Sequence, residues 1–116
     1  MGTGNVRGMR GESLAAAWLE LAGHEVVGRN LRLGGVEVDL VARDGATCVV
    51  VEVKLRGRAD YGGAALAVDH VKRSRLKRAA RALEQSGATG VRIDVIAIET
   101  SPDGLVLRHY RNAVTD

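Results

Sequence analysis

Apolar residues in the first part of the chain recur at helical spacing. Leu14, Trp18 and Leu21 lie four and three positions apart, which places them on one face of an α-helix. Gly23 stands where a helix can end in a left-handed cap, because glycine adopts that conformation without steric cost. The pattern predicts a helix over Gly8–Ala22.

The central part of the chain alternates apolar and polar residues, which is typical of β-strands. We predict three strands, at Glu25–Leu33, Val36–Arg43 and Ala46–Leu55, with turns at Gly34-Gly35 and Asp44-Gly45. Asp-Gly is a strong signal for a two-residue hairpin loop. Because the connections are this short, the three strands should form an antiparallel meander.

The remaining residues predict a second helix and two further strands. Gly57–Val68 has the glycine content of a loop, and Asp69 is placed to cap a helix that ends near Gln85. Strands follow at Val91–Glu99 and Leu105–Tyr110. The order α-β-β-β-α-β-β predicts an α/β fold with a mixed sheet flanked by helices, since the second helix permits a right-handed parallel crossover.

The central hairpin determines which charged side chains share a face. A turn at Asp44-Gly45 places Glu37 opposite Glu52 and Asp39 opposite Val50 on the partner strand. Residues two apart on a strand also share a face. The predicted charged face therefore carries Glu37, Asp39, Glu52 and Lys54. The predicted core face carries Val36, Val38, Leu40, Val49, Val51, Val53 and Leu55.

Three carboxylates gathered on one face repel one another unless a cation lies between them. Mg²⁺ or Mn²⁺ would relieve that repulsion, because such a cation commonly binds one or two carboxylates together with water, and the Val53 carbonyl is a further candidate oxygen ligand. Lys54 would add a positive charge beside the metal, where it can stabilise charge in a transition state. The alternative is a solvent-exposed face with a Glu52–Lys54 ion pair.

Glu12 is a further candidate because it interrupts an otherwise apolar row of the first helix. Ala16 and Leu19 lie on the same row, so Glu12 should point toward the sheet or its rim. The alternative is a first-turn acid favoured by the helix dipole.

The charge is uneven along this single predicted domain, residues 1–116. The net charge is +3, yet Lys54–Arg81 holds nine Lys or Arg against two Asp. Such a segment suits a nucleic-acid partner, or else it is a solvated helix face. The candidate phosphate contacts are Arg56, Arg58, Lys72, Arg73, Arg75, Lys77 and Arg78. With one Trp, two Tyr and no Phe, the chain offers little for base stacking.

Several other classes of function are disfavoured. No apolar run has the length of a membrane span, and residues 1–10 lack a secretory signal, so we expect a cytoplasmic protein. Cys48 is the single cysteine and reads as a small buried hydrophobe. The histidines His24, His70 and His109 are scattered without zinc-ligand spacing. Asp94 is expected to form a structural ion pair with Arg92.

Two motifs make the chain similar to a known family. Val36-Glu37-Val38-Asp39-Leu40-Val41 and Val51-Glu52-Val53-Lys54-Leu55-Arg56 resemble the YraN family of uncharacterised bacterial proteins, as do Gly11-Glu12 and Arg108–Ala113. That family looks like the PD-(D/E)xK nucleases, the restriction endonucleases and archaeal Holliday-junction resolvases. The resemblance implies Asp39 and Glu52 as metal ligands, Lys54 as catalytic lysine and Glu12 as helix acid. Val36 departs from the family's usual Gly.

These observations lead to three functional hypotheses. The first is a Mg²⁺- or Mn²⁺-dependent endonuclease that hydrolyses phosphodiesters in DNA, including branched or structured DNA. The second is a module on the same fold that binds nucleic acid or protein without turnover, and the third is a purely structural subunit. Cutting two strands needs two active sites, so a two-fold homodimer is also expected.

Overall fold

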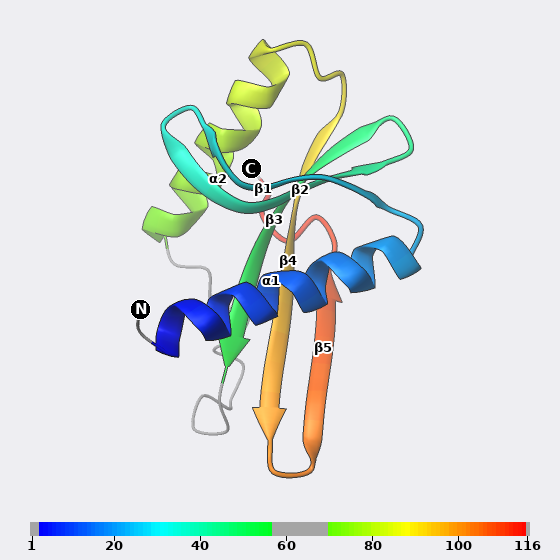
Figure 1. The fold of residues 1–116 in the computed structure, drawn as a ribbon. Helices are drawn as coiled ribbons and strands as arrows, with labels where there is room; N and C mark the ends of the chain where they lie inside the picture. Colours follow the sequence, from blue (N-terminus) through cyan, green and yellow to red (C-terminus); the bar gives the residue numbers. More distant parts are fainter. Residues whose placement is uncertain (1–2, 57–69, 116) are drawn as a thin grey trace.

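The computed structural model describes residues 3–56 and 70–115, and within residues 3–9 only the backbone. In the described residues two helices lie against one sheet, and Figure 1 shows how they are arranged. The elements are α1 (Thr3–Leu21), β1 (Glu25–Leu33), β2 (Val36–Asp44), β3 (Thr47–Arg56), α2 (His70–Gln85), β4 (Val91–Ser101) and β5 (Gly104–Tyr110). The predicted element order is therefore confirmed. The predicted loop over Gly57–Val68 and the cap at Asp69 lie outside the described residues.

The sheet has five strands in the order β1-β2-β3-β4-β5. Its first three strands form an antiparallel meander, β3 and β4 run parallel, and β5 returns antiparallel to β4. This is the predicted mixed sheet, and the α/β architecture is consistent with the restriction-endonuclease-like fold.

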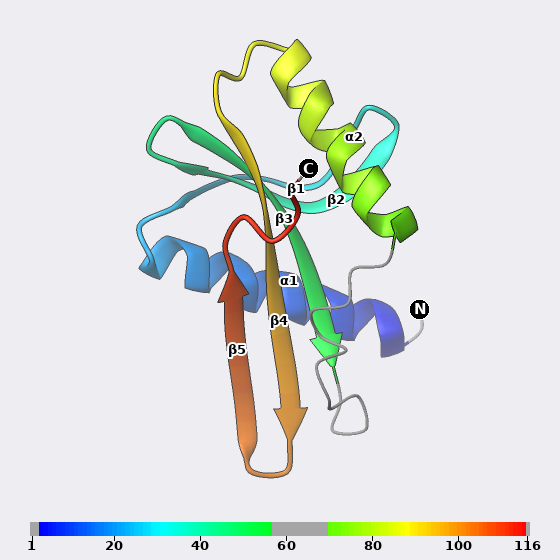
Figure 2. The ribbon, with the colours of Figure 1, turned by 180° about the vertical axis from the view of Figure 1, so that it is seen from behind.

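Each face of the sheet is covered by one helix, as Figures 1 and 2 show from opposite sides. The cluster beneath α1 contains Ala15, Ala16, Leu19, Leu40, Ala42, Val49, Val51, Ile96 and Ile98. The cluster beneath α2 contains Val36, Val38, Val41, Val50, Leu76, Ala79, Ile93 and Val114. The central strands are thus apolar on both sides, as expected for a sheet buried between two helical layers.

The first helix begins earlier than predicted, at Thr3 and not Gly8. Glycines near the N-terminus suggested a later start, because each costs roughly 1 kcal/mol against Ala in a helix. Once a helix is nucleated, however, each added residue brings a further hydrogen bond.

The register of the central hairpin also differs from the prediction. Asp44 pairs with Thr47, so the loop residues are Gly45-Ala46. Gly45 has a φ of 61°, which suits the first position of such a loop. Asp44 belongs to the strand because its carboxylate binds Arg92, with 2.8 Å between Oδ2 and Nη1.

The predicted core face is wrong for Val36 and Val38. Both lie beneath α2, whereas Leu40 lies beneath α1, so the facing of β2 changes at Asp39. A strict two-residue alternation fails here because β2 leaves its partner strand β3 at this point: the pairing between them ends at Leu40 and Val51.

Among the residues that the structure describes, neither helix combines the length and the apolar character that crossing a bilayer requires.

Candidate active site

The site begins at the fork where β2 and β3 separate. Beyond their last pair, β2 continues along β1 while β3 continues along β4 as far as Arg56. Asp39 stands in the opening of the fork. Its Oδ2 accepts a hydrogen bond from the Val53 backbone N–H at 2.8 Å, so a side chain replaces the lost contact between strands. This bond fixes the Asp39 carboxylate beside β3.

Glu52 brings a second carboxylate to the same place. It is only 7 % exposed. Burial raises the pKa of Asp39 to about 7, while the Val53 N–H acts in the opposite direction and the neighbouring Glu52, together with Glu12, raises it further. Part of the Glu52 effect is a hydrogen bond between the two side chains. The two acids therefore converge, and their proximity adds to the rise in the pKa of Asp39.

Glu12 reaches this site from α1. Gly11 is buried against β3, where an added Cβ would lie 3.8 Å from the Val53 side chain, so the next residue stands beside the fork. The Nδ2 of Asn30 donates a hydrogen bond to Glu12 Oε1 at 3.1 Å, and Asn30 adopts a left-handed φ of 50°. Because α1 starts at Thr3, Glu12 is not in its first turn, and the helix-dipole alternative does not apply.

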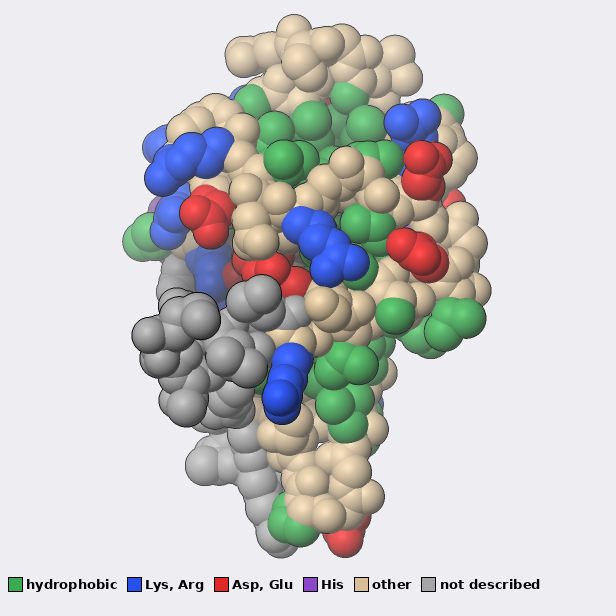
Figure 3. All heavy atoms as spheres, viewed as in Figure 1, with side chains coloured by type: hydrophobic (Ala, Val, Ile, Leu, Met, Phe, Trp, Pro, Cys, Tyr) green, Lys and Arg blue, Asp and Glu red, His purple; other side chains and the backbone are tan. Residues whose placement is uncertain are grey.

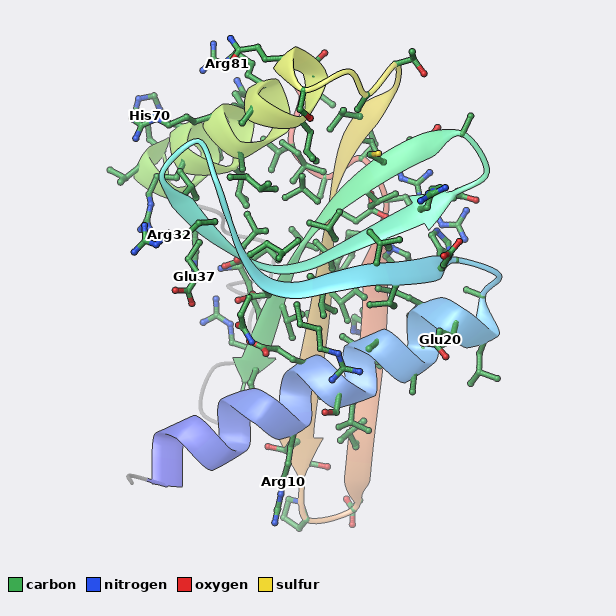
Figure 4. All side chains as sticks on the ribbon, turned by 45° about the horizontal axis from the view of Figure 1, so that its top comes forward. Arg10, Glu20, Arg32, Glu37, His70 and Arg81 are labelled. Carbon is green, nitrogen blue, oxygen red and sulfur yellow. The ribbon has the colours of Figure 1, made fainter. Side chains whose placement is uncertain are left out.

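Basic residues form the other wall of the site. Lys72 on α2 makes an ion pair with Glu52 through Nζ and Oε2. Arg75, one helical turn further, and Arg32 on β1 line the same groove, which encloses about 460 Å³ between α2 and the fork. Figure 4 shows Arg32 and Glu37 on the side of the molecule where α2 starts at His70, and Figure 3 shows acidic and basic side chains adjacent on this part of the surface.

The sequence-predicted residues are thus brought together only in part. Lys54 lies two positions after Glu52 on β3 and is partly buried, but it is not among the groove-lining residues. Arg73 instead donates to the Thr115 carbonyl at 3.3 Å, and Lys77 lines a separate cavity of about 320 Å³ near the C-terminus. Arg78 packs at the β1–β2 turn, and Arg56 ends β3. Arg58 lies outside the described residues.

The donor set fits a hard divalent cation. Within the described part of the chain, no three His, Cys, Asp or Glu side chains already form a ligand cluster. Two carboxylates and the Val53 carbonyl nevertheless match the few protein oxygens that Mg²⁺ uses, with water completing its shell. Burial and the neighbouring carboxylates of Glu52 and Glu12 raise the pKa of Asp39, and a cation bound between the carboxylates would oppose that effect. Asp39, Glu52 and Val53 would hold the metal.

A second polar cluster lies at the C-terminal end of α1. The fully buried Asp94 accepts from Arg92 Nε at 3.0 Å and binds His109 Nε2 at 2.8 Å. The Asp94–Arg92 ion pair is as predicted, and these contacts lower the pKa of Asp94 against the opposing effect of burial. Trp18 Nε1 donates to His109 Nδ1 at 3.1 Å, which makes Nε2 the protonated nitrogen of a neutral His109.

The prediction that the histidines are scattered is wrong for two of them. The ring centroids of His24 and His109 lie 5.8 Å apart, and His24 Nε2 is 3.0 Å from Arg92 Nη2. Sequence spacing missed this pair because the residues come from a helix end and an edge strand. The sequence offered one signal of this cluster, because Asp94 is an acidic residue in the apolar centre of a predicted strand.

The known proteins that this chain resembles share one family description. Residues 11–98 match the profile of a family described as "Uncharacterised protein family UPF0102". A UPF0102 protein of Geobacter sulfurreducens is 48% identical over 112 residues, covering 93% of this chain and 88% of that protein. One of Beutenbergia cavernae is 50% identical over 94 residues, covering 78% and 80%. One of Halorhodospira halophila is 42% identical over 93 residues, covering 80% and 77%.

Proposed function

This chain belongs to the uncharacterised protein family UPF0102, as the YraN resemblance indicated, and we propose that it is a Mg²⁺- or Mn²⁺-dependent endonuclease acting on DNA. The convergence of Asp39 and Glu52 at the strand fork carries this proposal. Two carboxylates brought together in a partly buried place repel each other, and titratable groups with perturbed pKa values concentrate at functional sites.

The groove combines two opposite charges in a way that suits a phosphodiester. Arg32, Lys72 and Arg75 attract a phosphate, whereas the carboxylates beside them repel it. A bound divalent cation would supply the missing positive charge and polarise a water. A surface that only binds DNA gains nothing from buried acids facing the phosphate. The arrangement therefore favours an enzyme over a binding module.

The roles of the residues follow from their positions. Asp39 and Glu52 would hold the cation, which would polarise a water, and Glu12, oriented by Asn30, would accept a hydrogen bond from that water. Arg75 and Arg32 hold the phosphate chain along the groove. Water adds to phosphorus as one bridging P–O bond breaks, and the departing oxygen leaves with a proton. Lys54 would approach the developing charge when the substrate is in place.

Incubation of the purified protein with DNA tests the proposal. Duplex, flap and four-way-junction DNA are each incubated with Mn²⁺ or with a chelator, and wild type is compared with Glu52→Gln. Glu99→Gln is the matched control, because Glu99 is a half-buried carboxylate on β4, in the strand beside β3. We expect Mn²⁺-dependent cleavage by wild type and Glu99→Gln, and none by Glu52→Gln. DNA binding without cleavage under every condition would support the binding module instead.

A homodimer is part of the same proposal, because paired cuts across two strands or a symmetric junction need two sites. Sedimentation with and without a four-way junction should show a two-fold assembly on the DNA. A monomer in both conditions would contradict it.

A further inference from the structure

The ion pair between Lys72 and Glu52 occupies the position that a metal would neutralise. Glu52 is buried, with only 10 % of its side chain exposed, and a buried carboxylate without a partner is strongly destabilising. Lys72 supplies that partner from the first turn of α2. Its own side chain is 42 % exposed, so the ammonium group lies at the boundary between the carboxylates and the open groove.

We propose that Lys72 is an exchangeable counter-ion: it neutralises Glu52 in the metal-free protein and moves to a DNA phosphate when the cation binds. This rests on the proposed function. A divalent cation at Asp39 and Glu52 brings two positive charges next to the ammonium group, and like charges repel at this range. The flexible stem of lysine lets the group turn away. Because Lys72 lines the groove, its ammonium group can then contact a phosphate bound there.

The geometry of α2 supports this exchange. Lys72 and Arg75 lie one helical turn apart on the stripe that ends in the buried Leu76, so both point into the groove from a fixed backbone. Arg75 is exposed and lies where it can contact phosphate at all times. Lys72 becomes available only after Glu52 has found another cation. Metal binding and phosphate binding are therefore coupled through one side chain.

Two consequences distinguish this role from that of an ordinary phosphate contact. Removing the Lys72 charge makes the metal-free site more negative, so the protein should bind Mn²⁺ more tightly. Removing it should weaken DNA binding by a larger factor when a metal is present than in a chelator, because in a chelator Lys72 is held by Glu52 and does not contact phosphate. A surface lysine that simply touches DNA would weaken binding equally in both conditions.

The experiment measures binding and not cleavage. Lys72→Met and Lys72→Gln are compared with wild type and with Lys77→Met, a control on the same helix that lines a different cavity. Running two neutral variants, each checked by thermal melting, leaves one to decide if the other does not fold. Mn²⁺ affinity is measured by calorimetry without DNA. Affinity for a labelled four-way junction is measured in Ca²⁺ and in EDTA.

We expect Lys72→Met to bind Mn²⁺ about tenfold more tightly than wild type, since one unit of positive charge leaves the neighbourhood of a divalent ion. Its junction affinity should fall by a larger factor in Ca²⁺ than in EDTA, while Lys77→Met leaves Mn²⁺ affinity unchanged. If wild type binds Mn²⁺ and neither Lys72 variant binds it more tightly, the exchange is wrong and the nuclease proposal stands. If wild type binds no Mn²⁺, both fail.

Discussion

Replacing Asp39 by Asn should stabilise the metal-free protein at alkaline pH while removing metal binding. The carboxyl group of Asp39 has a pKa of about 7 in the folded protein and 3.8 ordinarily. The folded state therefore holds this proton more tightly than the unfolded state does. The resulting stability is fully present below pH 3.8 and is lost as pH rises through 7. Above pH 7 the ionised Asp39 opposes folding.

The size of the effect follows from the two pKa values. Their difference corresponds to about 4 kcal/mol if the whole of it acts on folding. Asp39 is partly exposed, and water together with Lys72 screens its charge, so about 1–2 kcal/mol is a better expectation. For a domain of this size that is a rise in melting temperature of roughly 3–8 °C. Asn keeps an oxygen that can accept from the Val53 N–H.

The assay is urea unfolding in EDTA at pH 5 and pH 8.5. Asp39→Asn should exceed wild type in unfolding free energy at pH 8.5, and by less at pH 5, because pH 5 lies between 3.8 and about 7 and only part of the effect has developed there. Asp103→Asn, in the exposed β4–β5 turn, is the control and should show no pH-dependent difference. Adding Mn²⁺ at pH 8.5 should stabilise wild type and Asp103→Asn but not Asp39→Asn. An Asp39→Asn protein that is no more stable than wild type at pH 8.5 would refute the reasoning.

Four further outcomes are expected. Combining Asp39→Asn with Glu52→Gln should abolish the calorimetric signal of Mn²⁺ binding. Arg75→Ala should weaken DNA binding and reduce the slope of log affinity against log salt by about 1, because one phosphate contact is lost. Lys54→Ala should lower the cleavage rate severely in single-turnover assays while leaving DNA affinity nearly intact, because its charge serves the transition state. Asp94→Ala should cost about 3–5 kcal/mol in urea unfolding, since it removes the fully buried carboxylate that Arg92, His109 and the Asn112 N–H all contact.

Local sequence patterns were sufficient to predict the order of the elements and the mixture of parallel and antiparallel strands in the sheet. Alternation over nine or so residues identifies a strand because side chains point alternately to two faces, and this depends on neighbours in the sequence alone. The pair Asp39 and Glu52 was also predictable. The hairpin loop is Gly45-Ala46 and not Asp44-Gly45, which shifts the register by one position on each strand. This shift does not change whether Asp39 and Glu52 share a face of the hairpin.

Other features were decided by contacts between distant segments. The register depended on Arg92 holding Asp44 in the strand, and the change of face at Asp39 depended on β2 leaving β3. Neither feature can be predicted from the residues that are close to it in the sequence.

The chain by itself therefore determined which elements form, because that depends on periodicity among sequence neighbours, whereas the meeting of Asp39 and Glu52 also required Asp39 to bind the Val53 N–H across the fork. Only the tertiary structure decided that the cation beside Glu52 comes from Lys72 on α2 and that His24 meets His109. Those pairings depend on how helices and edge strands pack across the sheet, and packing joins residues whose separation in the sequence has no fixed period.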